Sequence, residues 1–169
     1  DGTRSYISGK PEYTISLALI KESQPIFGII YNPVTNEYFT AEKKKGAFCN
    51  RKRIRVKKNK NVNFCSFAVS SSEANNLTSY QFIKKNQIRK MGSIAYKIAL
   101  VAKGSIDVAL SFTKKNDWDL AAADLIVSEA GGEILGTDGK KIIYNSKNLN
   151  ISSVMASNIH IISELKNKF

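Results

Sequence analysis

The stretch that decides the fold class is residues 118–132, which read WDLAAADLIVSEAGG. Good helix formers predict a helix over Trp118–Ala130, and Gly131-Gly132 ends it because glycine tolerates the left-handed conformation found after helix C-termini. Sequences typical of buried strands flank this helix at 107–112 and at 133–135. A helix between two strands is typical of an α/β layer with a mainly parallel or mixed sheet.

The same alternation continues through the rest of the second half of the chain. Ser93 is a good N-cap for another helix, whose apolar face is formed by residues 94–102 at helical spacing. Gly104 stands where a left-handed residue would end that helix. We also predict strands at 64–69, 87–90, 142–144 and 154–156, and helices at 76–85 and 159–169.

The first 60 residues have a different pattern, which predicts an antiparallel meander after a short helix at 4–7. Apolar residues alternate or cluster in short runs between turn-forming residues. The predicted strands cover 13–19, 26–31, 37–41, 46–50 and 53–56. We therefore divide the chain into residues 1–61, which carry this first sheet, and residues 62–169, which form an α/β subdomain.

Composition limits the function classes that are open to this chain. It has 169 residues, about one domain, with 43% apolar and 24% charged residues, as expected of a globular protein. His160 is the only histidine, which excludes His-rich zinc sites, and Cys49 and Cys65 are too few for a disulfide scaffold. The sequence shows neither a secretory signal pattern nor an apolar run long enough to span a bilayer. We expect free thiols and a cytoplasmic location, without membrane contact.

The net charge of +12 favours anionic partners such as phosphorylated metabolites or nucleic acid. Basic residues concentrate at 43–60, where two interpretations are open. The run could form a phosphate-binding or nucleic-acid-binding patch, or simply a solvated loop and hairpin. Phe48 is the only aromatic residue in the run, so bases would have no stacking platform, and the solvated surface is favoured.

Small and hydroxyl-bearing residues precede three predicted helices, at Gly2-Thr3, 70–72 and Gly92-Ser93. Free N–H groups and the positive end of the helix dipole suit phosphate at such places, although Ser and Thr are also ordinary caps. Asp119 stands in the first turn of its helix, either as a cap or as a cation ligand. Asp124 lies about 140° further around the helix and cannot share its site. Together these features suggest Mg²⁺-assisted phosphate chemistry.

Two motifs resemble those of the inositol monophosphatase superfamily. Asp1-Gly2-Thr3 resembles the end of its D-P-x-D-G-T motif, and residues 118–132 resemble its W-D-x-A-A motif that runs on to E-A-G-G. The resemblance covers essentially the whole chain. Gly9–Thr14 and Asp117–Asp124 are similar to the bacterial 3′(2′),5′-bisphosphate nucleotidases within that superfamily. The resemblance to the superfamily implies a layered α-β-α-β-α sugar-phosphatase fold from which the N-terminal part is missing.

The resemblance also implies roles for individual residues. Asp1 and Asp119 would bind Mg²⁺, with Asp1 also part of the catalytic set. The main-chain N–H groups of Gly2-Thr3 would hold the phosphate, and the Thr3 hydroxyl would help to position the attacking water. Gly92-Ser93 would line the substrate pocket. The implied activity is a Mg²⁺-dependent phosphomonoesterase that acts on 3′(2′),5′-bisphosphate nucleotides or inositol monophosphate, as a homodimer.

The resemblance further places an Asp three residues before the position of Asp1 and a metal-binding Glu upstream of it. Neither is in this sequence, so two of the four expected carboxylates remain. We expect the polypeptide as given to be inactive or nearly so. The alternative is a binding protein that keeps the fold without the chemistry and uses its basic surface to hold RNA or another protein. Dependence on Mg²⁺ separates the two hypotheses.

Overall fold

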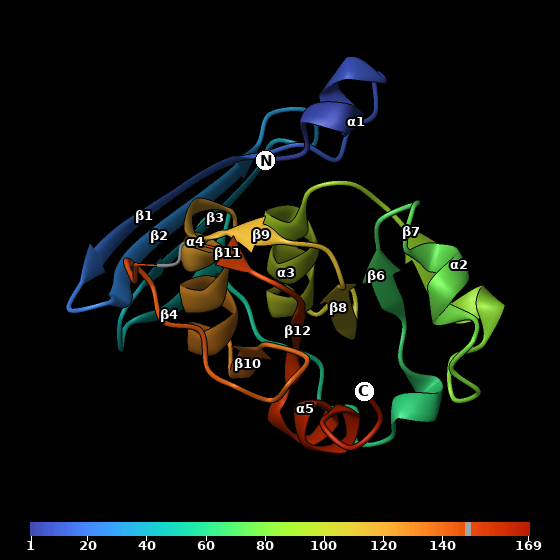
Figure 1. Cartoon of the computed structure of the whole chain (residues 1–169). Helices are drawn as coiled ribbons and strands as arrows, with labels where there is room; N and C mark the ends of the chain where they lie inside the picture. Colours follow the sequence, from blue (N-terminus) through green and yellow to red (C-terminus); the bar gives the residue numbers. More distant parts are fainter. Residues whose placement is uncertain (148–149) are drawn as a thin grey trace.

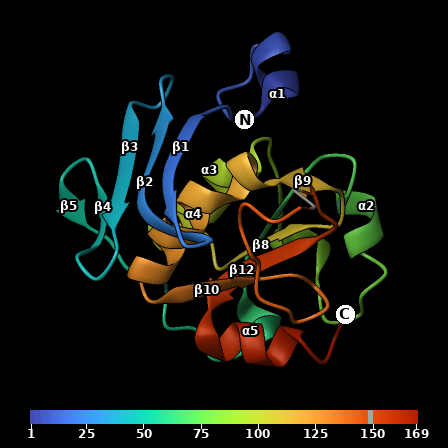
Figure 2. The same cartoon turned by 60° about the vertical axis from the view of Figure 1, so that its left-hand side comes forward.

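The computed structural model describes residues 1–147 and 150–169, which form four stacked layers (Figures 1 and 2). A first sheet packs on a pair of helices, α3 (Ile94–Ala102) and α4 (Asp117–Glu129), and these helices pack on a second sheet. Two shorter helices, α2 (Ala74–Leu77) and α5 (Ile159–Leu165), contribute to the core on the far side of the second sheet. The α/β layered fold is therefore confirmed, with four of the five layers that the resemblance implied.

The first sheet is an antiparallel meander in which each strand pairs with the next one along the chain. It follows the short helix α1 (Thr3–Ile7). Its strands are β1 (Ile15–Lys21), β2 (Gln24–Asn32), β3 (Glu37–Glu42), β4 (Gly46–Cys49) and β5 (Lys52–Arg53). The meander predicted from the first 60 residues is thus confirmed.

The second sheet is mixed, with strand order β10-β12-β8-β6-β7. The central strand β8 is parallel to β6 and antiparallel to β12, while β7 extends the parallel part. Its strands are β6 (Phe67–Val69), β7 (Ile88–Lys90), β8 (Val108–Ser111), β10 (Gly132–Leu135) and β12 (Val154–Asn158). The remaining elements are a two-stranded pairing of β9 (Lys115–Asn116) with β11 (Asn150–Ile151), and the 3₁₀ turns η1 (Val62–Phe64) and η2 (Lys85–Gln87).

Small residues allow α4 to lie close to the first sheet. Ala121, Ala122 and Ala123 are all buried in the larger of the two apolar clusters. Gly28 of β2 faces this helix, and a Cβ atom added to Gly28 would lie only 3.0 Å from the carbonyl oxygen of Ala122. The spacing between sheet and helix therefore depends on the absence of a side chain at Gly28.

Polar contacts fix α3 relative to the first sheet. The Tyr96 hydroxyl donates to Glu37 at the start of β3, and Lys103 just beyond the helix donates to the same carboxylate at 2.6 Å. Burial raises the pKa of Tyr96 to about 12, and the hydrogen bond to Glu37 acts in the same direction. Gly104 has φ +73, so the predicted left-handed end of α3 is confirmed.

The opposite face of the first sheet is open to solvent although it is apolar. Ile15, Leu17 and Leu19 of β1 point outward and are each more than half exposed. Phe27 and Tyr38 extend the same face across β2 and β3. In the described chain, the helical layer lies on the other side of this sheet.

Two predicted elements are wrong. The helix expected over 76–85 is replaced by the single turn of α2, because the Thr78 hydroxyl bonds the carbonyl oxygen of Asn75 at 2.7 Å and the chain turns away. The strand expected at 142–144 is a loop, because Tyr144 instead buries its ring and donates its hydroxyl to Asp124. Cys49 and Cys65 are free thiols, as expected, and the side chains of both are buried.

Replacing Gly28 with valine tests the close packing of α4. We expect Gly28→Val to lower the free energy of unfolding by about 1–3 kcal/mol, because the added side chain must push the helix away from the sheet. Urea denaturation followed by circular dichroism measures the change. The exposed control Lys21→Val should shift the unfolding free energy by less than about 0.5 kcal/mol. Equal effects of the two substitutions would contradict this account of the packing.

Candidate active site

The first motif docks onto the N-terminus of α3. The Asp1 carboxylate, through Oδ2, accepts hydrogen bonds from the Ser93 hydroxyl and the Ala95 main-chain N–H, both at 2.8 Å. The Asp1 main chain also pairs with Thr14 just before β1, through bonds of 2.8 Å and 2.9 Å. A carboxylate at this position is stabilised by the helix dipole as well as by the two donors. The structure thus joins two of the segments that the sequence analysis singled out.

Ser93 is the centre of this junction and has an unusual backbone conformation. Its φ of 48 is positive, which is uncommon outside glycine and is often found at functional positions. Its Oγ accepts from the Tyr96 N–H at 3.0 Å, so Ser93 is the N-cap of α3, as predicted. The same Oγ lies 3.0 Å from the Thr14 hydroxyl. One side chain therefore holds the helix start, Asp1 and the entry to β1 together.

The start of α4 lies next to the same strand. The Ser16 hydroxyl of β1 donates to the carbonyl oxygen of Trp118 at 3.4 Å, two residues along from Thr14. Asp119 follows Trp118, and its Oδ2 accepts from the Asn116 N–H at 3.0 Å. Asp119 is thus a cap, one of the two roles left open for it. Asp1 and Asp119 accordingly border the same end of β1, where α3 and α4 both begin (Figure 1).

The donor chemistry of this end of the molecule suits a hard cation such as Mg²⁺. Asp1 and Asp119 each use Oδ2 for the hydrogen bonds above, and their Oδ1 atoms accept none from the residues that the structure describes. Carboxylate oxygens are the ligands that Mg²⁺ prefers, together with water and substrate phosphate. Within residues 1–147 and 150–169, no group of three or more metal-ligating side chains converges. Asp1 and Asp119 therefore suit a cation that takes few of its ligands from this part of the protein.

Two glycines make room for the motifs to meet. Gly2 has φ +92, and a Cβ atom there would lie 2.7 Å from the Glu12 carbonyl oxygen. A Cβ atom on Gly92 would lie 3.0 Å from that same oxygen and 1.9 Å from the Ser5 hydroxyl of α1. Side chains are therefore excluded at both positions. The main chains of Gly2-Thr3 and Gly92-Ser93 come close on either side of Glu12.

A hollow of about 520 Å³ opens beside this junction, under α1. It contains residues from or beside all three of the predicted phosphate-binding helix starts: the first turn of α1, the serines of 70–72, and Gly92. Its complete lining is Arg4, Ser5, Ser8, Lys10, Glu12, Ser70, Ser71, Ser72, Lys90, Met91 and Gly92. Segments far apart in the sequence therefore meet in one concave site, which is of ordinary size for a small ligand.

A buried ion cluster behind this hollow was not foreseen. Glu73 accepts from the hydroxyls of Ser70 and Ser111 and from the Phe112 N–H. Burial raises the pKa of Glu73, but these hydrogen bonds outweigh burial and hold it below its ordinary value. Lys97 of α3 interacts electrostatically with Glu73, and burial lowers its pKa to about 8. The sequence contains a sign of this cluster, because Lys97 is a charged residue one helical turn after Ser93 within the otherwise apolar pattern of α3.

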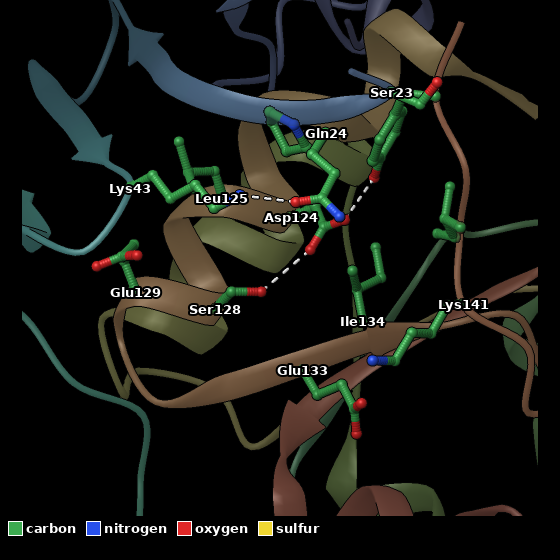
Figure 3. A pocket seen from close by; sticks show the side chains of 13 residues that line it. Ser23, Gln24, Lys43, Asp124, Leu125, Ser128, Glu129, Glu133, Ile134 and Lys141 are labelled. Carbon is green, nitrogen blue, oxygen red and sulfur yellow. Dashed lines mark hydrogen bonds between the residues drawn. The ribbon is translucent and has the colours of Figure 1, made fainter. Parts of the chain in front are cut away.

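A second hollow, of about 300 Å³, lies further along α4 and is shown in Figure 3. Asp124 faces it, accepting from the Tyr144 hydroxyl at 2.8 Å and from the Ser128 hydroxyl at 3.1 Å. Burial raises the pKa of Asp124 to about 6, and the hydrogen bonds oppose the shift only in part. Asp124 thus fastens the loop around Tyr144 onto α4. Asp117 holds the same loop, since its Oδ2 accepts from the Asn145 N–H at 2.7 Å.

Glu129 of the second motif also has a structural contact. Its two carboxylate oxygens accept from the main-chain N–H groups of Lys44 and Gly46, at 2.6 Å and 2.7 Å. Gly46 has φ +90, so this turn between β3 and β4 depends on glycine as well as on the carboxylate. Asp119 lies in the first turn of α4 and Glu129 is its last residue, so the helix connects the candidate site to a turn of the first sheet.

Removing the Ser93 hydroxyl tests the junction. We expect Ser93→Ala to lower the free energy of unfolding by about 1–2 kcal/mol, because it removes the cap of α3 and a donor to Asp1. Alanine keeps the Cβ atom of serine, so the cost of the positive φ at this position stays the same. Thermal and urea unfolding measure the loss. Ser71→Ala, at an exposed serine without a capping contact, is the matched control and should be nearly neutral. A neutral Ser93→Ala would show that the cap is dispensable.

The raised pKa of Asp124 predicts a pH-dependent stability. The folded protein holds this proton up to about pH 6, whereas the unfolded chain releases it near pH 4, so stability falls as pH rises between these values. Relative to Asp124→Asn, the unfolding free energy of the original protein should fall by about 2–3 kcal/mol between pH 4 and pH 6.5. Urea titrations across this range test it, with Glu22→Gln as the exposed control. A constant difference across the range would refute the shift.

Comparison with known proteins places this arrangement in a family. Residues 1–168 match the family model described as the inositol monophosphatase family. The chain is 35% identical over 158 residues to a fructose-1,6-bisphosphatase/inositol-1-monophosphatase of Thermotoga maritima, covering 90% of this chain and 60% of the relative. It is 32% identical over 176 residues to the Nus factor SuhB of Haemophilus influenzae, covering 99% and 64%.

Solved structures agree with these sequence relatives. The crystal structure of the extragenic suppressor protein suhB from Bartonella henselae superposes with a TM-score of 0.86 at 32% identity, over 99% of this chain and 68% of that one. The chain spans less than two thirds of the length of the two sequence relatives above. From its motifs, its layers and these matches, the chain belongs to the inositol monophosphatase family.

Proposed function

We propose that this chain is the metal- and phosphate-binding part of a Mg²⁺-dependent phosphomonoesterase. The observation that carries the proposal is the junction in which Ser93 holds Asp1 on the start of α3, beside the start of α4 with Asp119. The Asp1 carboxylate is held there at the start of α3, and Gly92, the residue before Ser93, lines a hollow of ligand size. Relatives of the chain include a fructose-1,6-bisphosphatase/inositol-1-monophosphatase and an inositol-1-monophosphatase, whose names describe phosphatases of phosphorylated sugars and inositols.

The residues would divide the work as follows. Asp1 and Asp119 would hold Mg²⁺, which supplies charge neutralisation and an activated water when bound. The N–H groups of Gly2-Thr3 would hold the phosphate oxygens. The Thr3 hydroxyl makes no hydrogen bond within the described residues, so it can orient the attacking water. Ser93 would keep the Asp1 carboxylate in one orientation, which lowers the reorganisation needed for reaction.

The proposed substrates are 3′(2′),5′-bisphosphate nucleotides, with inositol monophosphate as the other possibility. The net charge of +12 and the cations around the hollow favour the more highly charged substrate. Because this chain would supply two carboxylates to the proposed metal site, Asp1 and Asp119, Mg²⁺ binding should be weak and the activity of this polypeptide low. We propose that carboxylates outside this chain complete the ligand set.

Location and assembly are also proposals. Among residues 1–147 and 150–169, no helix has the length and apolarity needed to cross a membrane. Both cysteines are free thiols, which supports a reducing, cytoplasmic environment. We propose a homodimer on the basis of the family resemblance.

A basic groove supports the alternative function as a binding protein. A hollow of about 280 Å³ beside the start of α5 contains four cations from the basic run, together with His160. These cations are Arg55, Lys57, Lys58 and Lys60. An RNA strand could follow such a groove by phosphate contacts alone, without base recognition. Binding of this kind would be independent of Mg²⁺ and would weaken steeply with salt.

The enzyme proposal is tested by phosphate release. Adenosine 3′,5′-bisphosphate and inositol 1-phosphate are incubated with this chain, and with a version extended upstream by the length found in the relatives, with and without Mg²⁺. We expect Mg²⁺-dependent release that is weak for this chain and at least tenfold faster for the extended one. Asp119→Asn should abolish release and Mg²⁺ binding measured by calorimetry, because it removes one of two anionic ligands.

The exposed variant Asp138→Asn is the matched control and should leave both readouts unchanged. If the extended protein releases no phosphate from either substrate with Mg²⁺, the enzyme proposal is wrong. Salt-sensitive binding to a single-stranded RNA in the same preparation would then favour the basic groove.

A further inference from the structure

The hollow under α1 has a chemistry that the proposed phosphate-cleaving site does not use. Its three cations, Arg4, Lys10 and Lys90, come from three separate segments: α1, the loop after α1, and the end of β7. All three side chains are exposed, and none of them forms an ion pair within the described residues. Their charge is therefore available to a ligand.

The second hollow, along α4, provides a comparison within the same molecule. Lys43 and Lys141 line it, but so do three carboxylates, Asp124, Glu129 and Glu133. The hollow under α1 has three cations and the single carboxylate of Glu12. At neutral pH an anion is therefore attracted to the hollow under α1 and is not attracted to the one along α4. Both hollows are concave, so the difference in their attraction for anions comes from the charged side chains that line them.

Glu12 adds a second requirement on the ligand. Its Oε2 atom is buried and has no hydrogen-bond partner within the described residues, although Glu12 lines the hollow. A buried acceptor without a partner is costly, and a hydroxyl or amino group of a ligand would satisfy it. The hollow therefore suits a molecule that carries both an anionic group and hydrogen-bond donors, as a phosphorylated sugar or nucleoside does.

The hollow under α1 adjoins the proposed cleavage site at Gly92. Gly92 is one wall of the hollow, and its neighbour Ser93 holds Asp1. A Cβ atom on Gly92 would lie 1.9 Å from the Ser5 hydroxyl, so the main chain at Gly92 packs directly against α1. A substrate with two phosphates could place one at Gly2-Thr3 and the other among the cations.

We propose that Arg4, Lys10 and Lys90 bind the second phosphate of a doubly phosphorylated substrate, and that Glu12 accepts a hydrogen bond from its sugar hydroxyl. The inference rests on the proposed function, and it assigns residues to the preference for two phosphates over one. The cations act on the phosphate that is not cleaved. They are specificity-determining residues and take no part in bond breaking.

The test measures binding without metal, so that it does not depend on catalysis. Adenosine 3′,5′-bisphosphate and adenosine 5′-monophosphate are titrated into the protein by calorimetry in the presence of a chelator. We expect the bisphosphate to bind about tenfold more tightly, as one additional charge-assisted contact can provide. The double variant Arg4→Gln/Lys90→Gln should lose this preference. Because both side chains are exposed, its thermal unfolding should be unchanged.

The matched control is Lys43→Gln/Lys141→Gln, which removes the same charge from the hollow along α4 and should keep the tenfold preference. Glu12→Gln leaves a weaker, neutral acceptor and also removes a negative charge, so its effect is measured as the affinity ratio between adenosine 5′-monophosphate and its 2′,3′-dideoxy analogue, which should fall. If the original protein binds the bisphosphate and the monophosphate equally, or if the two double variants lose the preference to the same extent, the assignment is wrong.

Asp119→Asn separates this inference from the proposed function. In that variant the metal-free preference for the bisphosphate should remain, while phosphate release is lost. Suppose the protein never releases phosphate but keeps a preference for the bisphosphate that depends on Arg4 and Lys90. That result would overturn the enzyme proposal and support the assignment of these cations to the second phosphate. Phosphate release without this preference would support the enzyme proposal and overturn the assignment of the cations.

Discussion

The structure depends on one layer of helices that serves two sheets. α4 must pack against the first sheet on one side while belonging to a core that reaches the second sheet, and its buried alanines together with Gly28 make this close approach possible. α3 shares the layer and begins at the same end. Because both helices start beside the beginning of β1, their positive dipole ends point toward one region. The carboxylates of Asp1 and Asp119 occupy that region.

The packing arrangement also has an electrostatic consequence. Asp1 and Asp119 each contribute one oxygen to a helix start, and the other oxygen has no donor among the residues that the structure describes. Each carboxylate is therefore fixed in orientation before any cation arrives. The Oδ1 atoms of Asp1 and Asp119 would be able to hold a cation while the Oδ2 atoms keep their hydrogen bonds at the two helix starts. Preorganisation of this kind reduces the reorganisation that would otherwise weaken both metal binding and catalysis.

Local patterns were sufficient for α3, α4 and the meander, because periodicity, caps and glycines are encoded within each segment. They failed at 76–85 and 142–144, where Thr78 and Tyr144 bond to groups that no local pattern identifies. The motifs indicated Asp1, Ser93 and Asp119, but not the hollow, whose cations come from separate elements. The division at residue 61 remains a prediction, since the core cluster includes strands from both parts.

The contacts that assemble the site join residues very distant in sequence. Asp1 bonds to residues 92 and 94 positions later, and Ser16 to one 102 positions later. Closing such long loops costs entropy before any contact compensates for it, so these contacts form late in folding. During synthesis, the first residue of this segment must wait until more than half of the segment has left the ribosome. During that interval the face of the first sheet that α3 and α4 later cover is exposed, and chaperones would find its apolar strands accessible.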